Sequence, residues 1–218
     1  LTSIAETCQD LLPRELNFSD EEHKQDLNLA LTTLASRTQH LGKFIERFRQ
    51  ISSLPMPSLL PTPLPPLLEQ IRVFYQPQLT QHNIALEIDI QSQQLVMLDS
   101  AQIEQVLINL IKNAIEALQS FASQQQASNA KTDTAAWQGK ITLSLAQNSA
   151  QQLYIEVADN GPGIADYVVE MIFVPFFTTK QQGSGIGLSL SRQIMINHGG
   201  DLVYVSRPQG GCFRCLFG

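Results

Sequence analysis

The chain has 218 residues, of which 43% are hydrophobic, enough for a globular protein with a buried core. Its formal net charge of -6 disfavours nucleic acid as a partner, because phosphate backbones bind basic surfaces. No run reaches the ~18 consecutive apolar residues of a membrane span, and no secretory signal opens the chain. We therefore predict a cytoplasmic domain, with any inner-membrane anchor in segments outside this chain.

Residues 1–53 have the pattern of a helical hairpin. Residues 1–12 resemble the end of a helix, 13–17 form a break, and Ser19 opens a capping box with Glu22. The helix that follows, to about Ser52, carries a heptad series of Leu27, Leu31, Leu34, Thr38, Leu41, Ile45 and Phe48. A hairpin alone buries little apolar surface, so we favour a homodimeric four-helix bundle over packing on its own domain.

Residues 54–66 contain six prolines, which fix φ and lack the amide hydrogen that a helix needs. This segment is predicted to be a semi-rigid linker and the boundary between two domains.

Residues 67–218 show a mixed pattern. Helices are predicted at 67–81, from Asp99 or Ser100 to about 118, and at 185–198. Strands are predicted at 83–90, 94–98, 140–146, 153–158, 201–206 and 211–217, and the Gln- and Ala-rich residues 119–138 as a loop of low order. These elements indicate an α+β fold, a two-layer α/β sandwich with helices on one face of a mainly antiparallel sheet.

Cys212 and Cys215 form a C-x-x-C pair within the last predicted strand. Residues three apart on a strand point to opposite faces, so the two sulfurs should diverge. We expect neither a metal site nor a disulfide from this pair.

Asn109 and Asn113 lie four residues apart on the most apolar predicted helix and so share a face. Two carboxamide oxygens one turn apart can bind a hard cation such as Mg²⁺. The alternative is that both amides cap local backbone or face solvent.

Two glycine-rich segments flank an aromatic one. Asp159-Asn160-Gly161-Pro162-Gly163-Ile164 follows a strand, where the carboxylate can accept a hydrogen bond from the amine of adenine, although the motif alone is also a simple turn. Gly183-Ser184-Gly185-Ile186-Gly187-Leu188 opens a helix, where free amides favour phosphate. Phe173 to Lys180 lies between them and, by itself, could be a surface loop anchored by phenylalanines.

The order and spacing of these segments resemble the histidine-kinase branch of the superfamily that includes DNA gyrase, the ninety-kilodalton heat-shock chaperone and the MutL proteins. Asn109–Ala114 is similar to the N box, Asp159–Gly163 to the G1 box, Phe173–Lys180 to the F box and Gly183–Leu188 to the G2 box. The resemblance runs from about Leu64 to the C-terminus, is greatest to nitrogen-regulation-type sensor kinases, and implies a Bergerat-type ATP-binding fold. It extends more weakly over the hairpin, the dimerisation and phosphoacceptor region of such kinases.

The resemblance implies that ATP and Mg²⁺ bind here. Asp159 would bind the adenine amine, and Asn113 would be the main Mg²⁺ ligand, with Asn109 beside it or on the phosphates. Lys180, in a mobile lid, would meet the γ-phosphate. Asn109, Asn113 and Lys180 would be the catalytic residues. The implied ATP-binding set is Asn109, Asn113, Asp159, Gly161, Gly163, Ile164, Phe176, Thr178, Thr179, Lys180, Gly183, Ser184, Gly185, Ile186, Gly187 and Leu188.

The implied activity is transfer of the γ-phosphate to a hairpin histidine, for relay to an aspartate of a response-regulator receiver domain. Gyrase and the chaperone usually carry a glutamate at the position of Asn109 to activate water, so an amide there favours phosphotransfer over hydrolysis. Two alternatives remain open, namely a nucleotide-binding signalling module without catalysis and an ATPase of the gyrase or chaperone kind.

The chain departs from the family pattern at two places. The family usually has a Gly-Thr pair before the phenylalanine of the last strand. This chain has Gly211 there, so the hydroxyl that would support Asp159 is missing. In addition, His23, His40, His82 and His198 all lack the acidic neighbour of a phosphoacceptor. We therefore expect the acceptor histidine to lie outside this chain.

Overall fold

The computed structural model describes residues 25, 27–39, 42, 54–128, 137–180 and 183–218. The chain divides into two compact units, Leu1–Ser53 and Leu54–Gly218. In the first unit, residues 27–39 are helical, as predicted, and Leu27 and Leu34 of the heptad series are exposed. The first helix of the predicted hairpin, the capping box and the rest of the heptad series lie outside the described residues.

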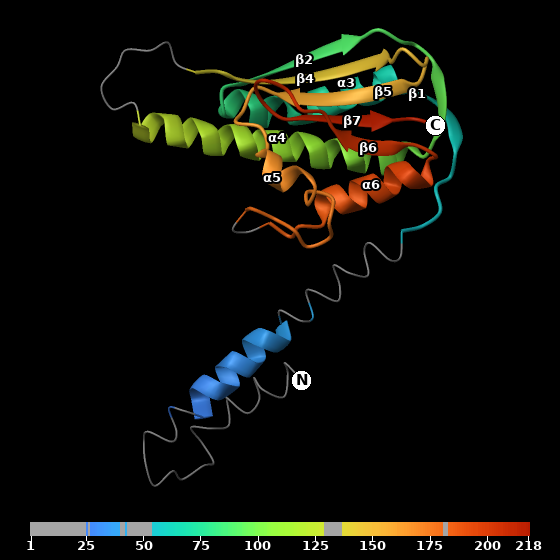
Figure 1. The fold of residues 1–218 in the computed structure, drawn as a ribbon. Coiled ribbons are helices and arrows are strands. Elements are labelled where there is room, and N and C mark those ends of the chain that lie inside the picture. Colours follow the sequence, from blue (N-terminus) through green and yellow to red (C-terminus); the bar gives the residue numbers. More distant parts are fainter. Residues whose placement is uncertain (1–24, 26, 40–41, 43–53, 129–136, 181–182) are drawn as a thin grey trace. The chain divides into compact units, whose positions relative to one another are not determined.

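The second unit is built on a five-stranded sheet with the order β2-β4-β5-β7-β6 (Figure 1). Its strands are β2 (Ile84–Ile90), β4 (Gly139–Gln147), β5 (Leu153–Asp159), β6 (Asp201–Tyr204) and β7 (Cys212–Leu216). Only the β2–β4 pair is parallel, and the other neighbours within this sheet are antiparallel. The predicted mainly antiparallel sheet is therefore confirmed.

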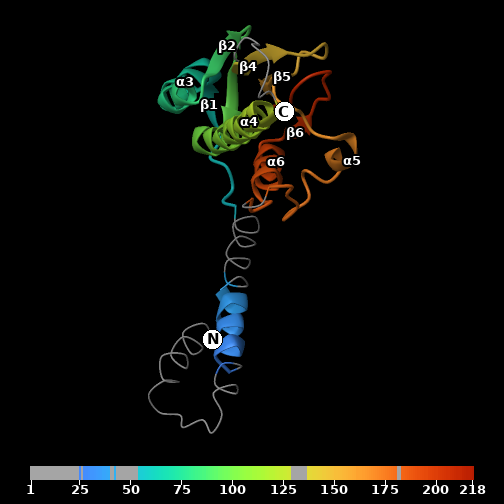
Figure 2. The ribbon, with the colours of Figure 1, turned by 90° about the vertical axis from the view of Figure 1, so that its left-hand side faces the viewer.

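Three helices cover one face of this sheet: α3 (Leu64–Gln81), α4 (Ser100–Ser128) and α6 (Gly187–Asn197). Figures 1 and 2 show them along the same layer of the unit, with α4 between the other two. The core lies between the two layers, because alternate strand residues and one face of each helix are apolar. Its fully buried side chains include Leu68, Ile103, Leu107, Ile111, Ile141, Leu143 and Ile155. The predicted two-layer α+β fold is confirmed.

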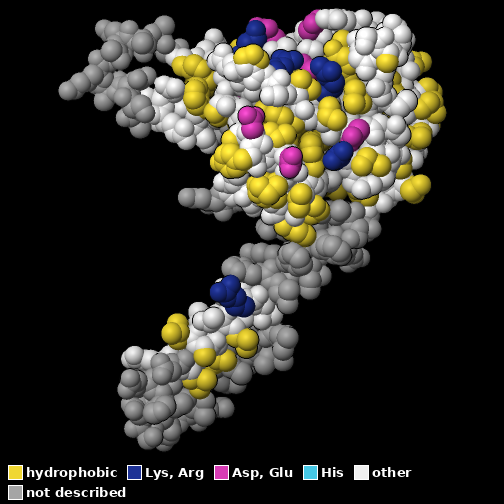
Figure 3. All heavy atoms as spheres, viewed as in Figure 1, with side chains coloured by type: hydrophobic (Ala, Val, Ile, Leu, Met, Phe, Trp, Pro, Cys, Tyr) yellow, Lys and Arg dark blue, Asp and Glu magenta, His cyan; other side chains and the backbone are white. Residues whose placement is uncertain are grey.

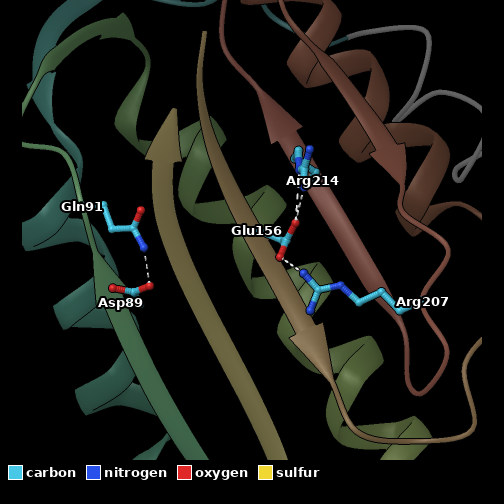
Figure 4. A network of polar contacts seen from close by, with 5 residues as sticks. All are labelled: Asp89, Gln91, Glu156, Arg207 and Arg214. Atoms are coloured by element: carbon cyan, nitrogen blue, oxygen red, sulfur yellow. Dashed lines mark hydrogen bonds and ion pairs between the residues drawn. The ribbon is translucent and has the colours of Figure 1, made fainter. Parts of the chain in front are cut away.

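Polar side chains project from the opposite face of the sheet. Glu156 of β5 is buried there between Arg207 and Arg214, with Arg214 Nη2 2.8 Å from Glu156 Oε2 (Figure 4). The Arg214 guanidinium also lies 4.3 Å from the centroid of the Tyr154 ring. A carboxylate with so little access to water needs such cationic partners, because unpaired charge is costly to bury.

The two cysteines of β7 point to opposite faces, as predicted. Cys212 lies on the side of Glu156, and Cys215 packs in the helix-facing core. Both are buried and free, and burial raises the pKa of each thiol to about 12. Neither sulfur is a reactive thiolate at neutral pH.

The predicted linker differs from the structure. Residues Leu60–Pro63 form a strand, β1, that pairs antiparallel with β3 (Leu95–Leu98), and α3 begins at Leu64 rather than at residue 67. Pro61 and Pro63 are two apart, so their missing amide hydrogens fall on one side of the strand and leave the other side to pair. Pro65 and Pro66 occupy the first turn of α3, where an amide hydrogen is not needed.

Helix α4 is ten residues longer than predicted. It ends at Ser128, so the first half of the expected loop at 119–138 is helical. The remaining element ends agree with the predictions within one or two residues, and a four-residue helix, α5 (Asp166–Val169), was not predicted.

The N-terminus of α4 is a junction between three segments. Asp99 Oδ1 accepts the amides of Ala101 and Gln102 at 3.1 and 3.2 Å, which caps the helix. Asp99 Oδ2 accepts the amide of Ser58 at 3.1 Å, and these backbone hydrogen bonds lower the pKa of the carboxyl. The Asp99 amide in turn donates to His198 Nε2 at 3.0 Å, at the end of α6.

The face of this unit seen in Figure 3 is mostly uncharged. Figure 3 shows small apolar patches among uncharged polar groups, with charged side chains scattered between them. Among the described residues, no helix is long and apolar enough to span a bilayer.

Candidate functional site

A pocket of about 840 Å³ opens between α4, the turn after β5, α5 and the start of α6. Its lining includes Asn113 and Glu116 from α4, Asp159 and Gly163 from the turn, and Lys180 from the segment before α6. Four stretches that are far apart in sequence therefore meet in one cavity large enough for a nucleotide.

Asp159 is fixed at the end of β5 by backbone donors. Its Oδ1 accepts the amides of Gly161 at 2.8 Å and Gly211 at 3.2 Å. Among the described residues, Oδ2 has no hydrogen-bond partner. Burial raises the pKa of this carboxyl, while the hydrogen bonds from Gly211 and Gly161 oppose the shift. The result is a pocket carboxylate with one oxygen anchored and the other left for a ligand.

Glycines let the β6–β7 loop approach Asp159 closely. A Cβ on Gly210, whose φ is +81°, would lie 1.7 Å from the Asp159 carbonyl oxygen, and one on Gly211 would lie 2.7 Å from Asp159 Oδ2. The hydroxyl expected by analogy near position 211 is absent, and the amide of Gly211 binds the carboxylate instead.

Asn109 and Asn113 have different surroundings. Asn109 Nδ2 donates to Ser191 Oγ of α6 at 2.9 Å, and a Cβ on Gly187 would lie 2.3 Å from Asn109 Oδ1. Asn113 Oδ1 accepts a hydrogen bond from Lys180 Nζ at 2.9 Å. Asn109 thus links α4 to α6, whereas Asn113 contacts Lys180 in the segment before α6.

The segment from Phe173 to Lys180 is anchored at both ends. The Phe173 ring lies 6.4 Å from that of Phe213 and 5.0 Å from the Arg192 guanidinium. Phe176 has φ +69°, and its amide donates to the Gly185 carbonyl at 2.8 Å. A non-glycine residue at positive φ costs of order 1–3 kcal/mol and is typical of functional sites.

Gly185 itself has φ +67°, and a Cβ there would lie 2.4 Å from the Phe176 carbonyl carbon. The chain then enters α6 at Gly187, with Ile186 as the N-cap residue. The first amides of a helix have no intrahelical acceptor, and no acidic side chain occupies the first turn of α6, whose residues Gly187 and Leu188 line the pocket. Such a terminus favours an anionic ligand.

The pocket brings together most of the residues implied by the resemblance. Three of them, Gly161, Phe176 and Ile186, do not line it: Gly161 supports Asp159, Phe176 holds Gly185, and Ile186 is buried. The prediction missed Glu116, Ala117 and Ser120, although positions three, four and seven after Asn113 share its helix face. It also missed lining residues that only the tertiary fold brings near: Val168, Ile172, Phe177 and Phe213.

Neither described histidine belongs to the site. His198 is buried, with Nδ1 2.8 Å from the Ile194 carbonyl and Nε2 accepting the Asp99 amide, so both ring nitrogens are engaged. His82 is exposed at the end of α3 and does not line the pocket. His23 and His40 lie outside the described residues.

The profile of the histidine kinase-, DNA gyrase B- and HSP90-like ATPases matches residues 98–217, a range that contains all four segments. The chain belongs to this family. The sensor protein FixL of Bradyrhizobium diazoefficiens is 31% identical over 199 residues, which are 91% of this chain and 36% of FixL. The C4-dicarboxylate transport sensor protein DctB of Rhizobium meliloti is 31% identical over 84% of this chain and 27% of DctB.

The catalytic domain of the histidine kinase ThkA is 31% identical, with a TM-score of 0.59 over 73% of this chain and 94% of that domain. The chain thus contains an ATPase domain of the kind found in sensor histidine kinases. It spans about a third of the length of the two sensor proteins.

Proposed function

We propose that this domain binds Mg-ATP in the pocket and transfers the γ-phosphoryl group to a histidine of a dimerisation hairpin. In that reaction an imidazole nitrogen forms a bond to the γ-phosphorus while the bond to the β–γ bridging oxygen breaks, leaving ADP. The phosphoryl group then passes to an aspartate of a response-regulator receiver domain. The observation that carries the proposal is Asp159, anchored through one oxygen with the other available in the pocket.

The adenine amine is the donor that this free oxygen would accept. Because Gly161 and Gly211 hold Oδ1, Oδ2 is presented in one orientation and selects a donor rather than an acceptor on the base. Gly163, with φ +73°, lets the backbone turn beside the base without a side chain in the way.

The start of α6 would hold the phosphates. Its free amides and the positive end of the helix dipole favour the anionic chain, and the hydrogen bond from Asn109 to Ser191 fixes this helix against α4. Thr178 and Thr179 add hydroxyls to the same side of the pocket.

The donor set fits Mg²⁺. Among the described residues no cluster of three His, Cys, Asp or Glu side chains could hold a metal by itself, which suits an ion held mainly by phosphate and water oxygens. Asn113 Oδ1, already bound to a cationic group in this structure, would supply the protein ligand. The ion, when bound, neutralises charge on the phosphates, and Lys180 adds a second positive charge.

The acceptor and the partners are inferred from the rest of the chain. The two described histidines are unsuited as acceptors, one being buried and hydrogen-bonded and the other away from the pocket. The heptad series supports a homodimer through the hairpin, with the acceptor histidine outside these 218 residues. Catalysis then consists of positioning and charge neutralisation.

The first prediction concerns Asp159→Asn. The amide keeps an acceptor for Gly161 and Gly211 but can turn a donor toward the adenine amine, so ATP affinity should fall by about a hundredfold or more. Calorimetry with Mg-ATP measures this, and circular dichroism checks the fold. Asp89→Asn is the matched control, since Asp89 is an exposed carboxylate on β2 that is bonded to Gln91. An affinity equal to that of the wild type would refute the pocket assignment.

The second prediction concerns the acceptor. Incubated with γ-labelled ATP, the chain should not label itself, but it should label a sensor-kinase hairpin that carries its histidine and is supplied in trans. Loss of the label in acid, which is typical of a phosphoramidate bond, identifies phosphohistidine. Label on His23 or His40 would contradict an external acceptor, and steady ATP hydrolysis without transfer would favour the gyrase-type alternative.

A further inference from the structure

Lys180 is bound to two side chains on α4. Its Nζ lies 2.9 Å from Asn113 Oδ1 and 2.5 Å from Glu116 Oε2, and all three residues line the pocket. Asn113 and Glu116 are three apart and so lie on one face of the helix. Glu116 has no role in the binding of nucleotide as described so far.

The ion pair is not explained by stability. The side chains of Lys180 and Glu116 are 42% and 39% exposed, and exposed pairs of this kind contribute little to folding. A carboxylate beside a pocket for a polyanion also opposes ligand binding unless a cation covers it. The position of Glu116 therefore needs a reason in what it does to Lys180.

That reason lies in the demands on Asn113 Oδ1. In this structure the oxygen accepts a hydrogen bond from the Lys180 ammonium group, and in the proposed function the same oxygen binds Mg²⁺. An ammonium group and Mg²⁺ bound to the same oxygen would repel each other, so Lys180 needs another anchor if it is to stay at the phosphate end of the pocket. Glu116, at 2.5 Å, is that anchor.

We propose that Glu116 is a positioning residue that keeps Lys180 at the pocket rim, so that the ammonium group meets the γ-phosphate while Asn113 holds the metal. This inference rests on the proposed function. It extends the proposed function, because it assigns to Glu116, on the turn of α4 after Asn113, the placement of the Lys180 ammonium group. Glu116 acts through Lys180 and does not touch the reacting atoms.

The test is a double-mutant cycle of Glu116→Gln and Lys180→Met, measured as the rate of phosphoryl transfer to a supplied hairpin at saturating Mg-ATP. Each single variant should lose between about tenfold and a hundredfold in rate, because a misplaced catalytic group loses this much. The double variant should be no slower than Lys180→Met, because Glu116 has nothing left to position. The Kd for ATP of Glu116→Gln should change by less than about threefold.

Glu87→Gln is the matched control. Glu87 forms an ion pair with Lys140 at 2.8 Å, with side chains 59% and 46% exposed, away from the pocket lining. This variant should transfer phosphate at the wild-type rate, and all variants should keep the wild-type Tm.

Three results would overturn the inference: a normal rate for Glu116→Gln, losses that multiply in the double variant, or an effect on Kd alone. The proposed function fails separately, since in that case the wild-type chain itself transfers nothing to the hairpin.

Discussion

Asp159, the proposed adenine ligand, has a carboxyl whose pKa is raised by its surroundings. Its carboxylate is held away from water with backbone donors on one oxygen, and burial outweighs those donors and raises its pKa from the ordinary value of 3.8. The folded protein without nucleotide therefore binds this proton more tightly than the unfolded chain does. A nucleotide amine would stabilise the charged form that the empty pocket disfavours.

The third prediction concerns the protein without nucleotide and follows from this shift in the pKa of Asp159. A group whose folded-state pKa is raised contributes stability that is complete below the unfolded pKa and is lost as the pH rises through the folded pKa. Wild-type protein should therefore lose stability relative to Asp159→Asn over the range that begins at about pH 4, the ordinary value for an aspartate carboxyl, and extends upward from there. Thermal unfolding of both proteins without ATP, across that range, measures the difference in Tm. A difference that does not change with pH would contradict the assignment of the shift to Asp159.

At the scale of the elements, the prediction succeeded where a local pattern had one physical cause. Alternation in β2 and β4 reflects one more buried and one more polar face, and the apolar positions of α4 up to Leu118 reflect contact with the sheet. The pocket segments were found because glycines and a strand-end aspartate have few other reasons to occur in that order.

Helix α4 was cut short in the prediction because its last ten residues leave the core. Periodicity ends at Leu118, and the glutamines and alanines beyond it suggested low order, although both are good helix formers and no glycine or proline follows before Ser128. The Phe121 ring lies 5.3 Å from that of Trp137, a contact from across the intervening segment that no local pattern could reveal.

Strand β1 and the contacts of Glu116 were missed for the same kind of reason. Prolines in a segment argue against a strand unless the strand with which it pairs is known. The partner of β1 is β3, which lies some thirty residues later in the chain and so gives no local signal. A glutamate on a helix is ordinarily a solvated side chain, and only the fold brings Lys180 to it.

At the scale of the molecule, every residue that lines the pocket lies in the unit Leu54–Gly218. The last prediction compares two truncations of the chain. Residues 54–218 should bind ATP with a Kd within about twofold of that of the whole chain, as expected of a self-contained domain.

Residues 67–218 should be less stable, because this fragment lacks β1 and Leu64, which is fully buried. Loss of one such core side chain costs about 2–5 kcal/mol, so Tm should fall by roughly 5–15 °C. Calorimetry and thermal unfolding of both fragments check this. Equal stability of the two would mean that residues 54–66 are a linker after all.

The junction at Asp99 has a mechanical consequence. The chain enters this domain through a segment that is stapled to the first turn of α4 by the Ser58–Asp99 hydrogen bond and by a second one from Gln102 Nε2 to the Pro55 carbonyl. Asn109 lies ten residues after Asp99, about 15 Å at the rise of an α-helix. A displacement of residues 55–58 would therefore act directly on the first turn of the helix that carries Asn109 and Asn113, and the hydrogen bond from Asp99 to His198 ties the end of α6 to the same place.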